Sequence, residues 1–290
     1  MTGTDSTALS PQGERQPIVD SHLHIWDRRL FSYPWLEARP DLPAYCDLPA
    51  QRPDLEFVAI ESGVDSRQAE QENAWLEARL ASRSDCIGIV AAIDVTSDPA
   101  QFERALERML RSTVLAGFRL HASGKVPDSS VQWQLIASGA RESSIACEFL
   151  VRRTGLRSLL DQLGQIQFAR FAIDHGGDPP VGSGWDSPEF SAWRGHMSEI
   201  SQDPRAYVKL SAALRRTPSP TVDELRVVEF LLESFGMHRC MLGSDWPVSQ
   251  TSAERSPHSL LDRVLELAPG QFSRQVLRDT AHHFYERRCR

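Results

Sequence analysis

Three side chains that can bind a metal ion or transfer a proton lie close together in IVDSHLHIWD, residues 18–27. Asp20, His22 and His24 are two residues apart, and alternate side chains of a β-strand point to the same face. Two imidazoles on one face can bind one divalent ion, while the carboxylate either takes part directly or hydrogen-bonds an imidazole or backbone groups. The HxH spacing also occurs by chance in surface and core histidines, so its meaning depends on its surroundings.

Two further candidate groups stand at the ends of later apolar segments. FAIDHGG, residues 171–177, contains His175, and CMLGSDWP, residues 240–247, contains Asp245. If these segments are strands, both residues follow the carboxyl ends of their strands, where barrel enzymes place their chemistry. A His-x-His pair with a distant His and Asp is a suitable ligand set for one zinc ion with a position left for water.

Eight short apolar segments alternate with segments of helical period. Asp98 before Pro99 predicts a helix start, Thr221 with Glu224 forms a capping-box pattern, and a third helix is predicted after Ser66. Eight such units predict an α/β fold, a single-domain (β/α)8 TIM barrel spanning residues 17–290. The predicted strands are Ile18–His24, Phe57–Gly63, Ile87–Asp94, Ala116–Ala122, Ser144–Val151, Phe168–His175, Tyr207–Leu214 and Cys240–Asp245.

The segment between the first two predicted strands, residues 28–54, is rich in proline and aromatic residues and has no helical period. Connections of this length in a compact domain usually have a function, so we expect it to cover the barrel mouth. Trp35 in this segment and Trp246 are candidates for the wall of a substrate site. Residues 1–16 are polar, and we expect them to form a flexible tail rather than a targeting segment.

Composition narrows the class of partner. The net charge of -7 comes from interspersed acidic and basic residues without a Lys/Arg run, which does not indicate a nucleic acid or a membrane surface as partner. A small-molecule substrate is expected. The five cysteines show no CxxC spacing, which favours a reducing, cytoplasmic compartment. No segment approaches 18 uninterrupted apolar residues, and nothing indicates the oligomeric state.

The motifs VDSHLHIWD, YPWL, GFRL, IDH, YVKLSA and RCMLGSDWPV, in this order, resemble the amidohydrolase superfamily. They resemble its amidohydrolase-2 branch, which includes sugar-lactone and pyrone-dicarboxylate lactonases, from about Ile18 to the C-terminal helix. The resemblance implies a barrel hydrolase that opens a lactone, with His22, His24 and His175 matching the metal-site histidines and Asp245 matching the general base. It implies one divalent ion, zinc by preference, or none, because some lactonases of this branch work without metal.

Further site residues are expected on the fourth and fifth strands. Arg119 and His121 share a strand face and are predicted to bind a carboxylate or the lactone carbonyl, with Arg119 counted among the catalytic groups. A buried ion pair of Arg119 with Glu148 or Asp94 is the alternative. Glu148 lies inside a strand, where a carboxylate must be paired or protonated, and it is also a candidate for substrate binding.

Two residues depart from the pattern of the branch. Glu61 stands where a neutral amide is usual, and as an extra carboxylate it would bind metal or repel acidic substrates. Lys209 stands where related metal-dependent decarboxylases bring a further histidine, which favours hydrolysis over decarboxylation. Its amine is expected either in the lumen, near substrate, or between helices. A decarboxylase, or a barrel with altered catalysis in specialised metabolism, remains the alternative to a lactonase.

Overall fold

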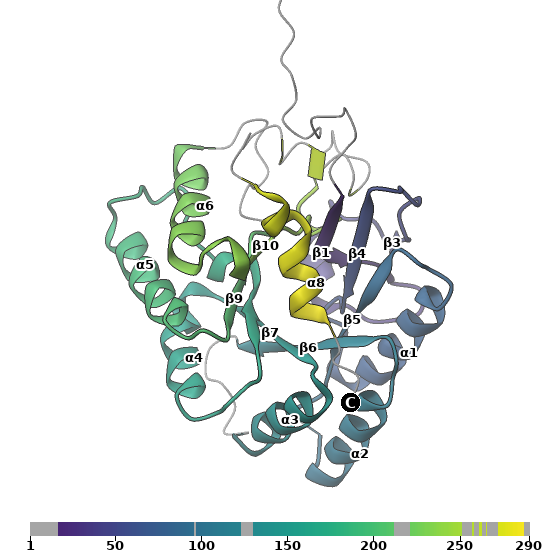
Figure 1. Cartoon of the computed structure of the whole chain (residues 1–290). Helices are drawn as coiled ribbons and strands as arrows, with labels where there is room; N and C mark the ends of the chain where they lie inside the picture. Colours follow the sequence, from purple (N-terminus) through teal and green to yellow (C-terminus); the bar gives the residue numbers. More distant parts are fainter. Residues whose placement is uncertain are drawn as a thin grey trace, which may run out of the picture.

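The computed structural model describes residues 17–95, 97–122, 130–211, 221–250, 257, 261–262, 265 and 272–286. Eight parallel strands form one sheet in the order β1-β4-β5-β6-β7-β8-β9-β10, with helices around it (Figure 1). The strands are β1 Ile18–His24, β4 Leu55–Ile60, β5 Cys86–Ala92, β6 Leu115–Ala122, β7 Ala146–Val151, β8 Phe171–Ile173, β9 Ala206–Lys209 and β10 Cys240–Met241. The helices are α1 Ala69–Leu80, α2 Pro99–Leu110, α3 Ser130–Ser143, α4 Leu156–Leu163, α5 Pro188–Ser201, α6 Val222–Phe235 and α8 Thr280–Tyr285.

Backbone hydrogen bonds join the last strand to the first. Ser21 N donates to Leu242 O at 3.0 Å, and Asp245 N donates to His22 O at 2.8 Å. Leu23 forms a parallel bridge with Trp246 beyond the end of β10. The sheet therefore closes on itself, which confirms the predicted (β/α)8 barrel.

Strand β1 coincides with its predicted bounds, whereas β8 and β10 are shorter than predicted. Beyond Ile173 the chain turns sharply, with positive φ angles of 53° at His175, 61° at Gly176 and 71° at Gly177. Asp245 also has a positive φ, of 55°. A backbone in this left-handed conformation cannot continue a strand, so the apolar pattern overestimated both strands. The predicted residues 212–214 of the seventh strand lie outside the described residues.

Local sequence signals start two of the helices as predicted. The Asp98 carboxylate accepts hydrogen bonds from Ala100 N and Gln101 N at the start of α2, whose first residue is Pro99. At the start of α6, Thr221 Oγ1 accepts from Glu224 N and Glu224 Oε2 accepts from Thr221 N. Both devices satisfy amide groups that a helix leaves without an internal partner.

Thr221→Ala removes one half of this capping box. We expect a loss of about 1 kcal/mol in the free energy of unfolding, because one amide of the first turn loses its acceptor. Urea unfolding of the variant measures this loss. Thr221→Ser keeps the hydroxyl and is expected to match the wild type; equal stability of all three proteins would contradict the role of the box.

The segment over residues 28–54 is tied to the carboxyl end of β4. Two short strands pair within and just before it, β2 Trp26–Asp27 and β3 Tyr45–Cys46, and η1 Pro34–Ala38 lies between them. Trp35 Nε1 donates to Ser62 O at 2.7 Å. Because Ser62 follows β4, this bond holds the segment against the same end of the barrel as the candidate site.

A buried acid lies beneath this segment. Glu72 of α1 has 0% exposure, and the buried Tyr33 hydroxyl and the backbone of Ser62 lie close to its carboxyl group. Burial and the nearby Glu61 carboxylate raise the pKa of Glu72 from its usual 4.5 to about 8. Glu72 is therefore a neutral acid at pH 7.

This raised pKa predicts a pH-dependent stability. Below about pH 4.5 the acid is neutral in both the folded and unfolded states; as pH rises towards 8, only the unfolded state ionises, and stability is lost. Glu72→Gln keeps the shape and cannot ionise. We expect it to unfold like the wild type near pH 4.5 and to be more stable by roughly 3 kcal/mol at pH 7. Urea unfolding at several pH values tests this, and a difference that does not change with pH would contradict it.

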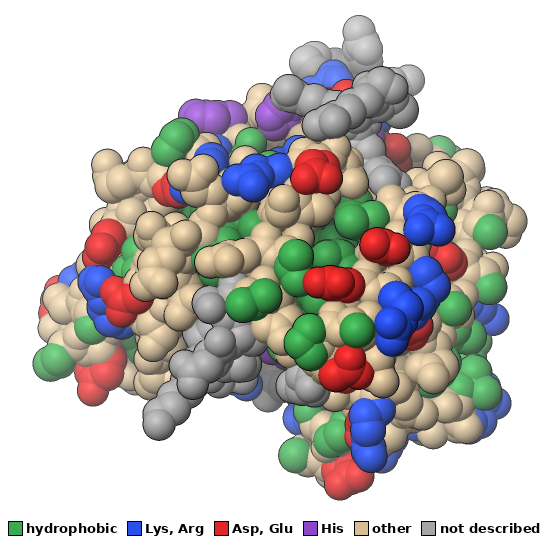
Figure 2. Space-filling model, turned by 90° about the horizontal axis from the view of Figure 1, so that it is seen from below, with side chains coloured by type: hydrophobic (Ala, Val, Ile, Leu, Met, Phe, Trp, Pro, Cys, Tyr) green, Lys and Arg blue, Asp and Glu red, His purple; other side chains and the backbone are tan. Residues whose placement is uncertain are grey.

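The surface carries both signs of charge. Figure 2 shows one face of the molecule, on which acidic and basic side chains are interspersed without a broad patch of either sign. The described residues include no helix of the length and apolar character needed to span a membrane.

Candidate metal and catalytic site

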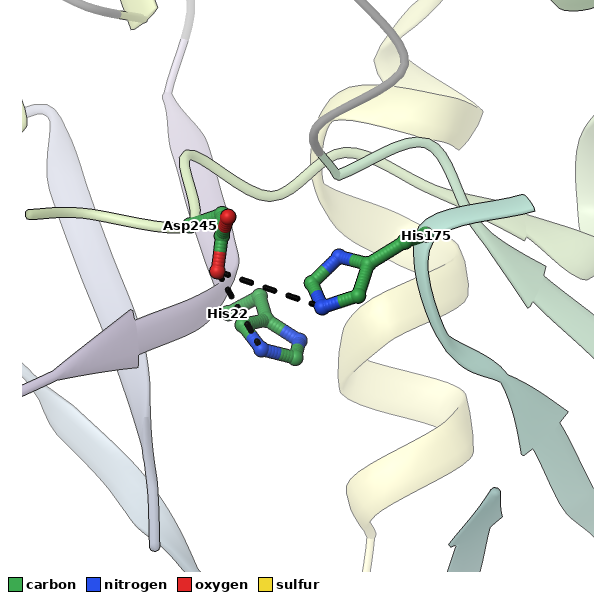
Figure 3. A group of neighbouring side chains, drawn as sticks. All are labelled: His22, His175 and Asp245. Atoms are coloured by element: carbon green, nitrogen blue, oxygen red, sulfur yellow. Dashed lines mark ion pairs between the residues drawn. The ribbon is translucent and has the colours of Figure 1, made fainter. Parts of the chain in front are cut away.

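The four residues predicted as metal ligands converge at one point. Asp245 Oδ1 lies 3.6 Å from His24 Nε2, 3.8 Å from His22 Nε2 and 3.9 Å from His175 Nε2. The Nε2 atoms of His22 and His24 are 3.1 Å apart. Figure 3 shows His22, His175 and Asp245 pointing toward one another, with Asp245 and His175 approaching from opposite sides.

Different elements supply these side chains. His22 and His24 come from β1, His175 from the 3-10 turn after β8, and Asp245 from the turn after β10. Gly243 permits the approach of that last turn to β1, because a Cβ on it would lie 2.7 Å from the Cβ of His22. A larger residue at this position would displace the turn that carries Asp245.

Four of the separations between these donors are compatible with a single zinc ion. Zinc bonds of about 2.0–2.1 Å in a tetrahedral site place ligand atoms about 3.4 Å apart. The four observed separations, 3.1 to 3.9 Å, bracket that value. His22, His175 and Asp245 also form a group whose donor atoms all lie within 4.8 Å of one another.

The outer ring nitrogens have different partners. His24 Nδ1 lies 3.1 Å from Ile60 O, and His175 Nδ1 lies 2.9 Å from Ser211 Oγ. Both partners can accept a hydrogen bond and so leave Nε2 free to bind an ion. His22 Nδ1 instead faces the Lys209 ammonium at 3.3 Å, with Asp174 Oδ1 at 3.6 Å. Burial, and then Lys209, lower the pKa of His22 well below its usual value.

Asp245 is ionised at neutral pH. Burial would raise its pKa, but the neighbouring His175 and His24 and a hydrogen bond from Ser249 outweigh this effect and lower the pKa to about 2. The Ser249 hydroxyl donates to Asp245 Oδ2 at 2.5 Å. Oδ1 is thus left facing the three imidazoles.

Asp20 does not join this cluster. One oxygen accepts from His22 N at 3.1 Å and Ser244 N at 2.8 Å, and the other accepts from the Ser244 hydroxyl at 2.6 Å. Simple alternation along β1 would point Asp20 to the same face as His22 and His24. A register shift in the strand after Asp20 accompanies its different surroundings. Asp20 anchors β1 to the turn before Asp245, which is the backbone-bonding alternative stated above.

Arg119 and His121 join a second charged group near the site. Arg119 is buried and lies 3.1 Å from Asp174 and 3.4 Å from Glu61, two carboxylates that the sequence did not identify as its partners. His121 Nε2 is 2.8 Å from Glu61 Oε1, and its side chain is 46% exposed. Burial opposes the charge of Glu61, but His121 and Arg119 together lower its pKa to about 2. His121 therefore offers an exposed imidazole held by a buried anion.

Lys209 and Glu148 form a buried pair in the lumen. Lys209 Nζ lies 2.5 Å from Glu148 Oε2, and both side chains have 0% exposure. The Tyr285 hydroxyl of α8 donates to the other Glu148 oxygen. The lumen position expected for Lys209 is thus observed. Neither side chain has accessible surface, and a contact of Lys209 or Glu148 with substrate stays a prediction.

The two predicted wall residues lie at the rim of the site. Trp35 is partly buried and hydrogen-bonded to the backbone of Ser62, and Trp246, 9% exposed, directly follows Asp245. The sequence reasoning missed Asp174, which precedes His175 and contacts both Arg119 and Lys209. Its place in IDH at a strand end was the available signal.

Comparison with known proteins agrees with this geometry. Residues 19–287 match the model of the amidohydrolase family. The chain belongs to the amidohydrolase family. This confirms the resemblance found in the motifs, and the site therefore lies in an amidohydrolase barrel.

Several amidohydrolase relatives are similar over most of their length. An L-fucono-1,5-lactonase of Burkholderia ambifaria is 29% identical over 247 residues, covering 80% of this chain and 81% of that protein. An amidohydrolase structure from Burkholderia multivorans with bound zinc has a TM-score of 0.73 at 23% identity, covering 93% of this chain and 99% of the other. A 2,6-dihydroxybenzoate decarboxylase from Rhizobium has a TM-score of 0.62 at 13% identity, covering 93% and 98%. The two structures share the fold.

Proposed function

We propose that this amidohydrolase hydrolyses a lactone of a small molecule, with Asp245 as general base and His22, His24 and His175 as zinc ligands or oxyanion-stabilising groups. The observation that carries the proposal is the position of Asp245 Oδ1 within 3.9 Å of all three imidazoles. The 29% identical L-fucono-1,5-lactonase supports the choice of a cyclic ester. The zinc in the Burkholderia multivorans structure supports the choice of ion.

Asp245 carries out both proton transfers of the reaction. It takes one proton from the attacking water as oxygen adds to the lactone carbonyl, and it returns this proton to the ring oxygen as the carbonyl carbon–oxygen bond breaks. The products are a carboxylic acid and an alcohol in one open chain. Because water supplies the oxygen, this step needs no further reactant.

The charge that develops on the carbonyl oxygen needs donors nearby. The imidazoles of His22, His24 and His175 can supply these donors when the rings are protonated, and Arg119 adds a fixed positive charge next to Asp174. A zinc ion, when bound by these histidines and Asp245, would supply Lewis-acid polarisation of the carbonyl and activation of water. His121, exposed at the rim, is positioned to contact substrate groups outside the ring.

Acid release from a panel of five- and six-membered lactones tests the function. The panel includes L-fucono-1,5-lactone, and a pH indicator follows the chelator-stripped protein and the same protein with added zinc. We expect turnover well above the spontaneous rate for at least one lactone. No turnover in either form, together with carbon dioxide release from a hydroxybenzoate, would contradict the proposal and favour a decarboxylase.

A further inference from the structure

A tethered cation lies next to the metal site. Lys209 Nζ is 2.5 Å from Glu148 Oε2, 3.3 Å from His22 Nδ1 and 3.5 Å from Asp174 Oδ1. His22, Glu148 and Asp174 are also a group whose ligand atoms lie close enough together to hold a metal ion. The Lys209 ammonium occupies this position, with no exposed surface.

The choice of lysine at this position is specific. The chain has 32 lysines and arginines, but Lys209 is one of only two lysines. An ammonium is a compact charge with three donors, whereas a guanidinium is a planar fork that suits paired oxygens. Three acceptors from three different strands or strand ends surround Nζ, and only the ammonium matches this arrangement.

The position of the ammonium fixes the proton on His22. An ammonium has no acceptor, so a hydrogen bond between Lys209 and His22 Nδ1 requires that Nδ1 carries no proton. The neutral ring must then carry its proton on Nε2, which lies 3.1 Å from His24 Nε2.

The hydrogen bond of His24 also requires that the proton of His22 lies on Nε2. The partner of His24 Nδ1 is the carbonyl oxygen of Ile60, at 3.1 Å, and a carbonyl can only accept. His24 therefore carries its proton on Nδ1 and offers the lone pair of Nε2 to the proton of His22. This arrangement of protons satisfies all three hydrogen bonds, from Lys209 to His22, from His22 to His24 and from His24 to Ile60.

We infer that Lys209 is a positioning residue that holds His22 as a hydrogen-bond donor through Nε2 and thereby lowers the affinity of the site for zinc. A metal-bound His22 needs its Nε2 lone pair, so its proton must move to Nδ1. There the Lys209 ammonium stands at 3.3 Å, and the acceptor Asp174 Oδ1 lies further away, at 3.6 Å, and itself faces Lys209 at 3.5 Å. His24 and His175 face no such conflict. The ammonium charge also repels a divalent ion on the far side of the ring.

Zinc affinity tests this inference independently of the proposed function, because it requires no substrate. Three chelator-stripped proteins are compared by competition with a chromophoric zinc chelator at pH 7: wild type, Glu148→Gln and Lys209→Met/Glu148→Gln. The single variant keeps the ammonium beside His22 and controls for the lost carboxylate, while the double variant removes both charges of the buried pair. We expect the double variant to bind zinc about tenfold more tightly than the single variant, a typical size for a partner of a metal ligand.

Nitrogen NMR of the metal-free wild type gives a second readout that does not depend on the folding of any variant. His22 is assigned by the signals lost in His22→Asn. We expect its proton on Nε2 and that of His24 on Nδ1. Equal or weaker zinc binding by a folded double variant, or a proton on His22 Nδ1 in the wild type, would overturn the inference.

Discussion

Asp245→Asn is expected to lower the rate of lactone hydrolysis by about 10³-fold or more while the barrel remains folded. The amide cannot accept the proton of the attacking water, and general-base catalysis contributes about 10²–10⁴-fold on its own. The substitution keeps the shape of the side chain and leaves an oxygen for the Ser249 hydroxyl that now donates to Asp245. Acid release from a turned-over lactone gives the rate, and circular dichroism confirms the fold.

A control variant distinguishes the loss of a carboxylate charge in general from the loss of the catalytic base. Asp161→Asn removes an exposed carboxylate on α4 that pairs only with Arg157 in the part of the chain described, and we expect it to leave turnover unchanged. Turnover by Asp245→Asn within tenfold of the wild type would exclude Asp245 as the base.

Lys209→Met is expected to lower the free energy of unfolding by about 3–5 kcal/mol. Lys209 is the cation that faces both Glu148 and Asp174, and all three side chains are fully buried. Removing one partner of a buried pair leaves a charge without compensation, which costs far more than the pair itself contributes. Urea unfolding at pH 7 measures the loss.

Adding Glu148→Gln to Lys209→Met should restore most of that stability, because Asp174 then retains Arg119 as its partner. A surface pair provides the control: the side chains of Arg157 and Asp161 are 58% and 54% exposed, so we expect Arg157→Met to cost less than about 1 kcal/mol. A loss for Lys209→Met no larger than that for Arg157→Met would contradict the buried-pair account.

Local signals in the sequence were sufficient for much of the fold. The short apolar run of β1 marked its bounds, and the capping residues Asp98 and Thr221 marked two helix starts, because each signal depends only on residues a few positions away. The ends of β8 and β10 were not predictable in this way. His175 and Asp245 adopt a left-handed backbone conformation that neither residue type requires, and contacts with other strands impose it.

The candidate site was predicted in part for the same reason. Histidines and an aspartate at strand ends can be recognised from their residue types and positions in the sequence. The partner of a buried charge, in contrast, depends on which strands are neighbours. Asp174 contacts Arg119 and Lys209 from β6 and β9, and the Tyr285 hydroxyl reaches Glu148 from the C-terminal helix. No spacing along the chain encodes these contacts, so the supporting network became visible only in three dimensions.

Hydrolysis in ¹⁸O-labelled water, read by mass spectrometry of the product, tests the central claim most directly. With a lactone turned over by the wild type, such as L-fucono-1,5-lactone, we predict an open-chain product with one heavy oxygen in its carboxylate, formed at a rate that Asp245→Asn does not reach. Heavy oxygen in the alcohol instead of the carboxylate, or a product that has lost carbon dioxide, would contradict attack of water on the lactone carbonyl.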